Sequence, residues 1–196
     1  MKVLARPGYA DIAAAVEPGL TTVGLYVGIT VYLPDRIAAL LPAPRPGVRP
    51  HITIAHAQVR LEQARRLRHA FGRKAYAVSL ADLRPFPLRL HGVGDFRRDA
   101  TPTPVVFLEV ADGAEQLAGL AAAFDAEFGL ERRFEYHPHV TLGHGEPDHV
   151  LDQIAAEFAD FEDEFQVLSL AFTTAHGTLS APRRITWHQP QTYSLI

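Results

Sequence analysis

The chain has 196 residues, no cysteine and a formal net charge of −3, from 19 basic and 22 acidic side chains. The absence of cysteine excludes disulfides, a thiol nucleophile and any cysteine-ligated metal centre. The slightly acidic balance argues against a generic polyanion binder, which would be strongly basic, so we expect any contact with nucleic acid to be local. The longest apolar run, residues 23–33, is shorter than the roughly 20 residues that cross a bilayer. We therefore expect a cytoplasmic protein with no membrane contact, and no obligate protein partner is evident.

Residues 1–22 are an N-terminal extension whose role the sequence does not indicate. After it, β-branched and aromatic residues predict strands, and Pro34-Asp35 opens a short helix through Leu41. A longer helix follows, with an apolar face and Gly72 as its stop signal. The elements predicted here are strands over 23–33, 51–56, 75–84 and 87–94, and helices over 35–41 and 58–71.

The second half of the chain shows a similar pattern. Asp112 and Glu115 have capping-box spacing for a helix that reaches Phe128, and Pro147 suits the first turn of another helix. The acidic stretch from Glu157 to Glu164 is expected to be a solvated helix end and loop. The strands predicted here are 104–111, 139–144, 165–176 and 183–193.

Both halves therefore read β-α-β-α-β-β, with matching elements roughly 80 to 90 residues apart. Such self-similarity indicates an internal duplication, with repeat halves of about 23–94 and 104–193. We expect residues 23–196 to form one domain of two related lobes.

The duplication is clearest in two seven-residue segments. Residues 50–56 read Pro-His-Ile-Thr-Ile-Ala-His, and residues 138–144 read Pro-His-Val-Thr-Leu-Gly-His. Four of the seven positions are identical and the other three are conservative, so chance recurrence at equivalent places is improbable.

Strand geometry links these segments to chemistry. Residues i and i+2 of a strand point to one face, so His51 projects with Thr53 and His139 with Thr141. Two such strands facing a common cleft would present two imidazoles, which can divide the roles of general base and general acid. Two hydroxyls would be available to bind phosphate oxygens. The combination suits metal-free attack at phosphorus.

Other interpretations of these histidines stay open. A strand histidine can be an ordinary polar residue near a sheet end, beside a threonine that simply favours strands. His137 and His139 also have H-x-H metal-ligand spacing, which His51 or His144 would have to complete. By strict alternation, His56 and His144 would face away from His51 and His139.

The paired motifs His51-Ile52-Thr53-Ile54 and His139-Val140-Thr141-Leu142 resemble those of the 2H phosphoesterase superfamily, which includes 2′-5′ RNA ligase-like enzymes and RNA 2′,3′-cyclic phosphodiesterases. The segment from Leu90 to Phe96 adds to the likeness, which covers about residues 23–190. The resemblance implies an α+β, bilobal fold with two pseudo-symmetric lobes and mainly antiparallel sheets around a central cleft. It implies that His51 and His139 are the catalytic acid/base pair, that Thr53 and Thr141 bind phosphate, and that no metal or cofactor is needed.

The predicted substrate is an RNA end or a small nucleotide with a 2′,3′-cyclic phosphate or a 2′-5′ linkage, and reverse ligation would use the same groups. The alternatives are a non-catalytic nucleotide- or RNA-end-binding module of the same fold and a histidine-ligated metallohydrolase. Arginines around helix 58–71 are expected to be solvated. Candidate substrate contacts are Phe96, Arg97, Arg98, Tyr136 and His137, with Phe86 and Trp187 as further candidates for base stacking.

Overall fold

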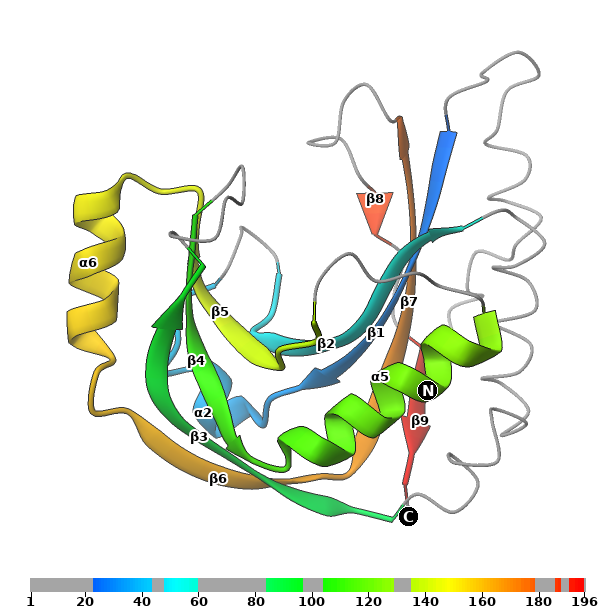
Figure 1. Ribbon diagram of the computed structural model, residues 1–196, viewed down its shortest axis with the longest axis horizontal. Helices are drawn as coiled ribbons and strands as arrows, with labels where there is room; N and C mark the ends of the chain where they lie inside the picture. The colour runs from blue at the N-terminus through cyan, green and yellow to red at the C-terminus, as the bar shows by residue number, and fades with distance from the viewer. Residues whose placement is uncertain are drawn as a thin grey trace, which may run out of the picture.

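The computed structural model describes residues 23–43, 48–59, 84–96, 104–128, 135–178, 186–187 and 191–195. These residues form a mixed α+β fold in which strands predominate (Figure 1). The helices are α2 (Asp35–Ala38), α5 (Ala114–Phe128) and α6 (Asp148–Glu157). The strands are β1 (Val23–Tyr32), β2 (His51–Val59), β3 (Phe86–Asp95), β4 (Val105–Asp112), β5 (His139–His144), β6 (Glu162–Val167), β7 (Ser169–Thr178), β8 (Thr186–Trp187) and β9 (Gln191–Ser194).

All of these strands belong to one sheet, whose order is β6-β3-β4-β5-β2-β1-β7-β8, with β9 also paired to β7. Every pairing is antiparallel. The sheet is strongly curled, with β4 and β5 rising on one side of its centre and β1 and β7 on the other (Figure 1). The predicted α+β class with a mainly antiparallel sheet is thus confirmed. Among the described residues, no helix combines the length and apolarity that a membrane crossing requires.

The centre of the sheet is the junction between β2 and β5, which are joined through the backbone pair Ile52 and Val140. On one side lie β5, β4, β3 and β6, and on the other lie β2, β1, β7 and β8. These halves of the sheet do not coincide with the halves of the sequence. β3 pairs with β4 and β6 of the later segment, whereas β7 pairs with β1 of the earlier one. Each half of the sheet is therefore built from both segments.

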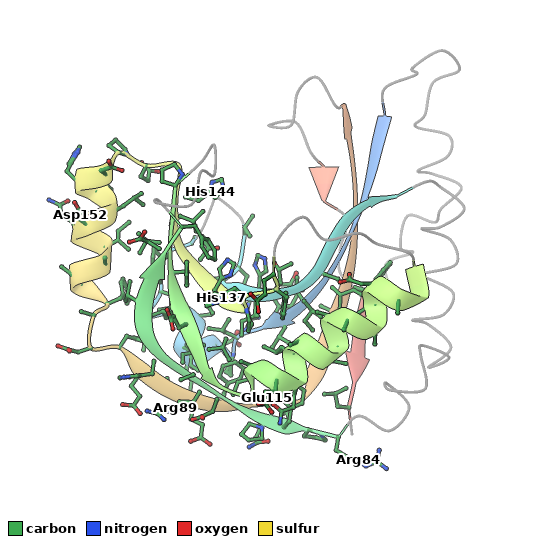
Figure 2. The ribbon with its side chains drawn as sticks, viewed as in Figure 1. Arg84, Arg89, Glu115, His137, His144 and Asp152 are labelled. Carbon is green, nitrogen blue, oxygen red and sulfur yellow. The ribbon has the colours of Figure 1, made fainter. Side chains whose placement is uncertain are left out.

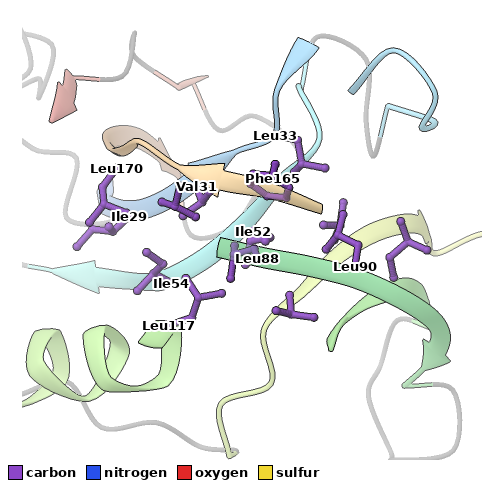
Figure 3. Packing of buried hydrophobic residues seen from close by; sticks show 14 of the residues in the cluster. Ile29, Val31, Leu33, Ile52, Ile54, Leu88, Leu90, Leu117, Phe165 and Leu170 are labelled. Atoms are coloured by element: carbon purple, nitrogen blue, oxygen red, sulfur yellow. The ribbon is translucent and has the colours of Figure 1, made fainter. Parts of the chain in front are cut away.

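The hydrophobic core lies against the sheet face opposite His51 and His139. Ile52, Ile54 and Val140 are fully buried there, with Leu117 of α5 packed into the same cluster (Figure 3). Helix α6 packs against β4 and β5, and it comes so close that a Cβ on Gly143 would lie 2.8 Å from Leu151 Cδ2. Helices α5 and α6 thus pack against β2 and β5 on the sheet face opposite His51 and His139.

Several predicted boundaries differ from the structure. Strand β2 continues to Val59, so the helix expected from residue 58 does not begin there; the remainder of that helix and the strand expected over 75–84 lie almost entirely outside the described residues. Asp112 is the last residue of β4, not a helix cap. Its carboxylate accepts a hydrogen bond from Arg89 at 3.2 Å, and α5 begins at Ala114 after Gly113 at φ +85°.

The C-terminal elements are also divided more finely than predicted. The strand expected over 165–176 is two strands, β6 and β7, separated by the exposed Leu168. The two strands pair with β3 and β1 respectively, so the chain crosses between the two halves of the sheet at this point. The acidic residues 162–164 lie in β6, not in a loop, and the strand expected over 183–193 contains the separate strands β8 and β9.

Candidate active site

The two H-x-T motifs lie at the N-terminal ends of the two central strands, β2 and β5. His51 is the first residue of β2 and His139 is the first residue of β5, as the sequence predicts for residues 139–144. His51, Thr53, His139 and Thr141 are all half-buried, whereas the residues between them are fully buried. This alternation confirms that each histidine shares a sheet face with its threonine.

The register brings the two motifs together. Ile52 pairs with Val140 in an antiparallel ladder, so His51 falls opposite Thr141 and Thr53 falls opposite His139. Side chains directly opposite each other in such a pair have Cβ atoms about 4.5–5.5 Å apart. Each imidazole therefore stands beside the hydroxyl of the other motif, and the four groups form one cluster across the centre of the sheet.

The same hydrogen bond holds both imidazoles. His51 Nδ1 lies 2.8 Å from the carbonyl oxygen of Arg49, and His139 Nδ1 lies 2.8 Å from the carbonyl oxygen of His137. A carbonyl oxygen only accepts, so Nδ1 is the protonated nitrogen in each ring. In the neutral ring Nε2 then carries the lone pair and is the atom able to take up a proton.

The surroundings of the two histidines differ despite this symmetry. The ring of Tyr32 lies edge-on to His51 at 6.1 Å between centroids. Arg49 lies 5.8 Å above the Tyr32 ring, forms an ion pair with Asp35 at 2.7 Å, and donates to the carbonyl oxygen of Leu33. The His51 side thus has a phenol and a guanidinium that is already engaged in other contacts.

Aromatic rings surround His139 instead. Phe107 lies 4.8 Å and Phe96 lies 5.3 Å from the His139 ring, centroid to centroid, and the two phenylalanines touch each other at 4.4 Å. The His137 ring is stacked on His139 at 6.4 Å, with 29° between the planes. Figure 2 shows His137 inside the curl of the sheet.

This environment lowers the pKa of His139 below its ordinary value. Burial is the main cause, because it disfavours the charged imidazolium, and the positive charges of His137 and His51 act in the same direction. The hydrogen bond to the His137 carbonyl opposes the shift and is outweighed. His139 is therefore held in its neutral form, with Nε2 available as a base.

Of the predicted substrate contacts, Phe96 and His137 lie next to His139. Tyr136 donates its hydroxyl to the carbonyl oxygen of Thr53 at 3.0 Å, and its ring packs against the core, so it links the approach to β5 with β2. Arg97 and Arg98 lie outside the described residues, as do nearly all the residues of helix 58–71. Phe86 is buried in the core, and Trp187 lies in β8.

The expectation that His144 faces away from His139 is wrong. The pairing of β4 with β5 shifts register between Val106 and Phe107, and both Leu142 and Gly143 are buried as a result. One extra residue in a strand reverses the alternation, which returns His144 to the face of His139. The pairing of β1 with β2 shifts at the equivalent place, between Ile29 and Thr30.

Sequence reasoning overlooked Phe107, because an aromatic residue within a strand of apolar residues carries no sign of a site. The place of the Phe107 ring beside His139 depends on Gly94 of β3, which lies opposite Phe107 in the register. A Cβ at Gly94 would lie 2.6 Å from the Phe107 ring, so only glycine leaves room for that ring beside His139. Gly94 belongs to the segment from Leu90 to Phe96 that contributes to the family resemblance.

The described residues contain no group of three or more histidine, aspartate or glutamate side chains arranged to hold a metal ion. The H-x-H pair of His137 and His139 thus finds no third ligand in this part of the chain. The arrangement supplies two imidazoles, two hydroxyls and an aromatic wall, which is the inventory for proton transfer around a bound phosphate.

A model of the 2′-5′ RNA ligase superfamily matches residues 31–178, which are most of the chain and include both motifs. None of the curated proteins matches the chain.

Two solved structures show the same fold. Escherichia coli LigT complexed with 3′-AMP is 20% identical, with a TM-score of 0.56 over 88% of this chain and 98% of LigT. The protein TT0787 of Thermus thermophilus is 21% identical, with a TM-score of 0.57 over 87% of this chain and 97% of TT0787. The family match over both motifs, together with the shared fold, shows that this chain belongs to the 2′-5′ RNA ligase superfamily of 2H phosphoesterases.

Proposed function

We propose that the protein is a metal-independent phosphodiesterase that opens 2′,3′-cyclic phosphates, or cleaves 2′-5′ phosphodiesters, of RNA or nucleotides. The observation that carries the proposal is the matched hydrogen bonding of His51 and His139, which leaves Nε2 as the reactive nitrogen of both rings. Structures of the similar LigT with 3′-AMP and with NADP+ support a nucleotide as the ligand.

In this mechanism His139 is the general base and His51 the general acid. His139 Nε2 takes a proton from water, and the water oxygen attacks phosphorus. As the bond from phosphorus to the ribose oxygen breaks, protonated His51 delivers the Nε2 proton to that leaving oxygen. The Thr53 and Thr141 hydroxyls donate to the non-bridging oxygens, and the product is a phosphomonoester. The lowered pKa of His139 favours the base role, because a base must begin neutral. The same groups with exchanged roles would support 2′-5′ ligation.

The direct test incubates the purified protein, in excess EDTA, with an RNA oligonucleotide that ends in a 2′,3′-cyclic phosphate. We expect opening of the cyclic end, and a loss of about 10²–10⁴-fold in rate for both His51→Ala and His139→Ala. His149→Ala, at an exposed position on α6, is the matched control and should retain full activity.

Two outcomes would favour the alternatives. Activity that is lost in EDTA and restored by zinc or manganese would favour a metallohydrolase built on His137 and His139. Tight binding of the RNA end without any product would favour a binding module.

A second substrate separates the roles of the two histidines. The second substrate is a phosphodiester with an activated aryl leaving group. That group departs without a proton, so cleavage of this substrate does not need a general acid. We expect His51→Ala to regain most of its lost rate on this substrate, whereas His139→Ala stays inactive. The reverse pattern would exchange the two assignments.

A further inference from the structure

His137 is exposed to solvent, and its ring also lies against three neighbouring rings of the site. It stacks on His139 at 6.4 Å, and it lies edge-on to Phe107 at 5.3 Å and to Phe96 at 5.8 Å. Its backbone carbonyl oxygen accepts a hydrogen bond from the Nδ1–H group of His139. His137 therefore interacts with His139 in two ways, through a backbone hydrogen bond and through the contact between the two rings.

The equivalent residue of the other motif is different. Arg49 stands two residues before His51 and offers the same carbonyl bond, but its side chain extends to Tyr32, Asp35 and Leu33. The backbone interaction is thus common to both motifs. In the part of the chain that the structure describes, a histidine ring stacked on the catalytic ring occurs beside His139 and not beside His51. The difference identifies the side chain of His137 as a separate contribution to the site.

We propose that His137 is a positioning residue that acts through His139: its ring holds the His139 ring in place, and its charge sets how readily His139 accepts a proton. The proposal takes the acid/base role of His139 from the proposed function. The two rings lie 6.4 Å apart, so a positive charge on one makes it harder to protonate the other. At this distance the midpoint of a titration would fall by about half a pH unit at the dielectric constant of bulk water, and by about two units at an effective dielectric constant near 20.

Among the residues that the structure describes, the other titratable groups near His139 come from the strands beside it and from β5 itself. His51 on β2 repels a proton on His139, as does His137. Glu109 lies opposite His139 on β4, with its Oε1 directed toward β3, where it would lie 2.8 Å from a Cβ on Gly94. His144 shares the face of His139 on β5 itself. All of these groups remain when His137 alone is changed, so they cancel in a comparison of His137 variants.

The test compares His137→Gln, which is neutral, with His137→Lys, which stays charged across the range. The His139 ring is titrated by NMR in the free protein, without substrate. We expect a lower His139 midpoint in the lysine variant, by about half to two pH units relative to the glutamine variant, and a smaller gap at 1 M salt because charge repulsion is screened. His149→Gln and His149→Lys, on α6, are the controls and should share one His139 midpoint.

Equal His139 midpoints in the two His137 variants would overturn the effect of charge that the proposal assigns to His137. A gap that persists unchanged at 1 M salt would also overturn it. The kcat/KM profile on the cyclic phosphate should follow the same order, with the acid limb at lower pH in His137→Lys. Absence of turnover would refute the proposed function alone, since the NMR titration does not depend on it.

Discussion

Replacing Gly94 with alanine should destabilise the protein, because the new methyl group has no space. It would lie 2.6 Å from the ring of Phe107 and 2.8 Å from Glu109 Oε1. Phe107 is only 2% exposed and is held by Phe96 at 4.4 Å, so its ring cannot swing aside freely. Overpacking of this kind costs about 1–3 kcal/mol. Alanine also lowers the backbone entropy of the unfolded chain, which offsets about 0.4–1 kcal/mol of this loss of stability. We therefore expect a net loss of roughly 0.5–2 kcal/mol in the free energy of unfolding.

Urea unfolding followed by circular dichroism measures this change, and Gly119→Ala is the matched control. Gly119 lies on the exposed side of α5 with no atom within 4 Å of an added Cβ, so that variant should gain about 0.5–1 kcal/mol. Because Phe107 also packs against His139 at 4.8 Å, the turnover of Gly94→Ala should fall while that of Gly119→Ala is unchanged. A Gly94→Ala protein as stable as the wild type would refute the argument that β3 and the Phe107 ring are in tight contact.

Three further predictions concern stability. Tyr136→Phe removes the hydroxyl bond to the Thr53 carbonyl and should cost about 1 kcal/mol in urea unfolding; an unchanged midpoint would mean that the bond contributes nothing. Thr30→Val should raise the thermal midpoint, because the buried Thr30 hydroxyl has no hydrogen-bond partner among the described residues, whereas a lower midpoint would reveal one. The depressed pKa of His139 contributes stability that is present above pH 6.5 and is lost as the pH falls through the folded value. The free energy of unfolding should therefore decline from pH 7 to pH 5 more steeply in the wild type than in His139→Phe, and parallel profiles would contradict this.

The central strands and their motifs could be predicted from the sequence because the signal there is local. The bounds of β5 and the shared face of His139 and Thr141 follow from alternation over a few residues. The same rule failed at His144, since the register shift opposite Leu142 depends on how β4 pairs with β5. That pairing is a property of two segments, and neither segment reveals it alone.

Long-range pairing also explains the other differences. The sequence around Leu168 is typical of one continuous strand. The strand ends there because β6 pairs with β3 whereas β7 pairs with β1, and the sequence alone does not show these partners. Asp112 has the spacing of a helix cap, but it lies opposite Arg89 in the register of β3 and β4, and its carboxylate forms an exposed ion pair with that arginine. The aromatic surroundings of His139 escaped prediction for the same reason, because Phe107 reaches the site through its register with Gly94.

The exchange of β3 and β7 between the two halves of the sheet makes the earlier and the later segment depend on each other. A chain ending after β3 would lack both of the strands with which β3 pairs, since β4 and β6 come later in the sequence. Two copies of that shorter chain would satisfy each other by trading their last strands, as domain-swapped dimers do. Each copy would bring one H-x-T strand to the common axis, so neither would hold the two-histidine, two-threonine cluster alone.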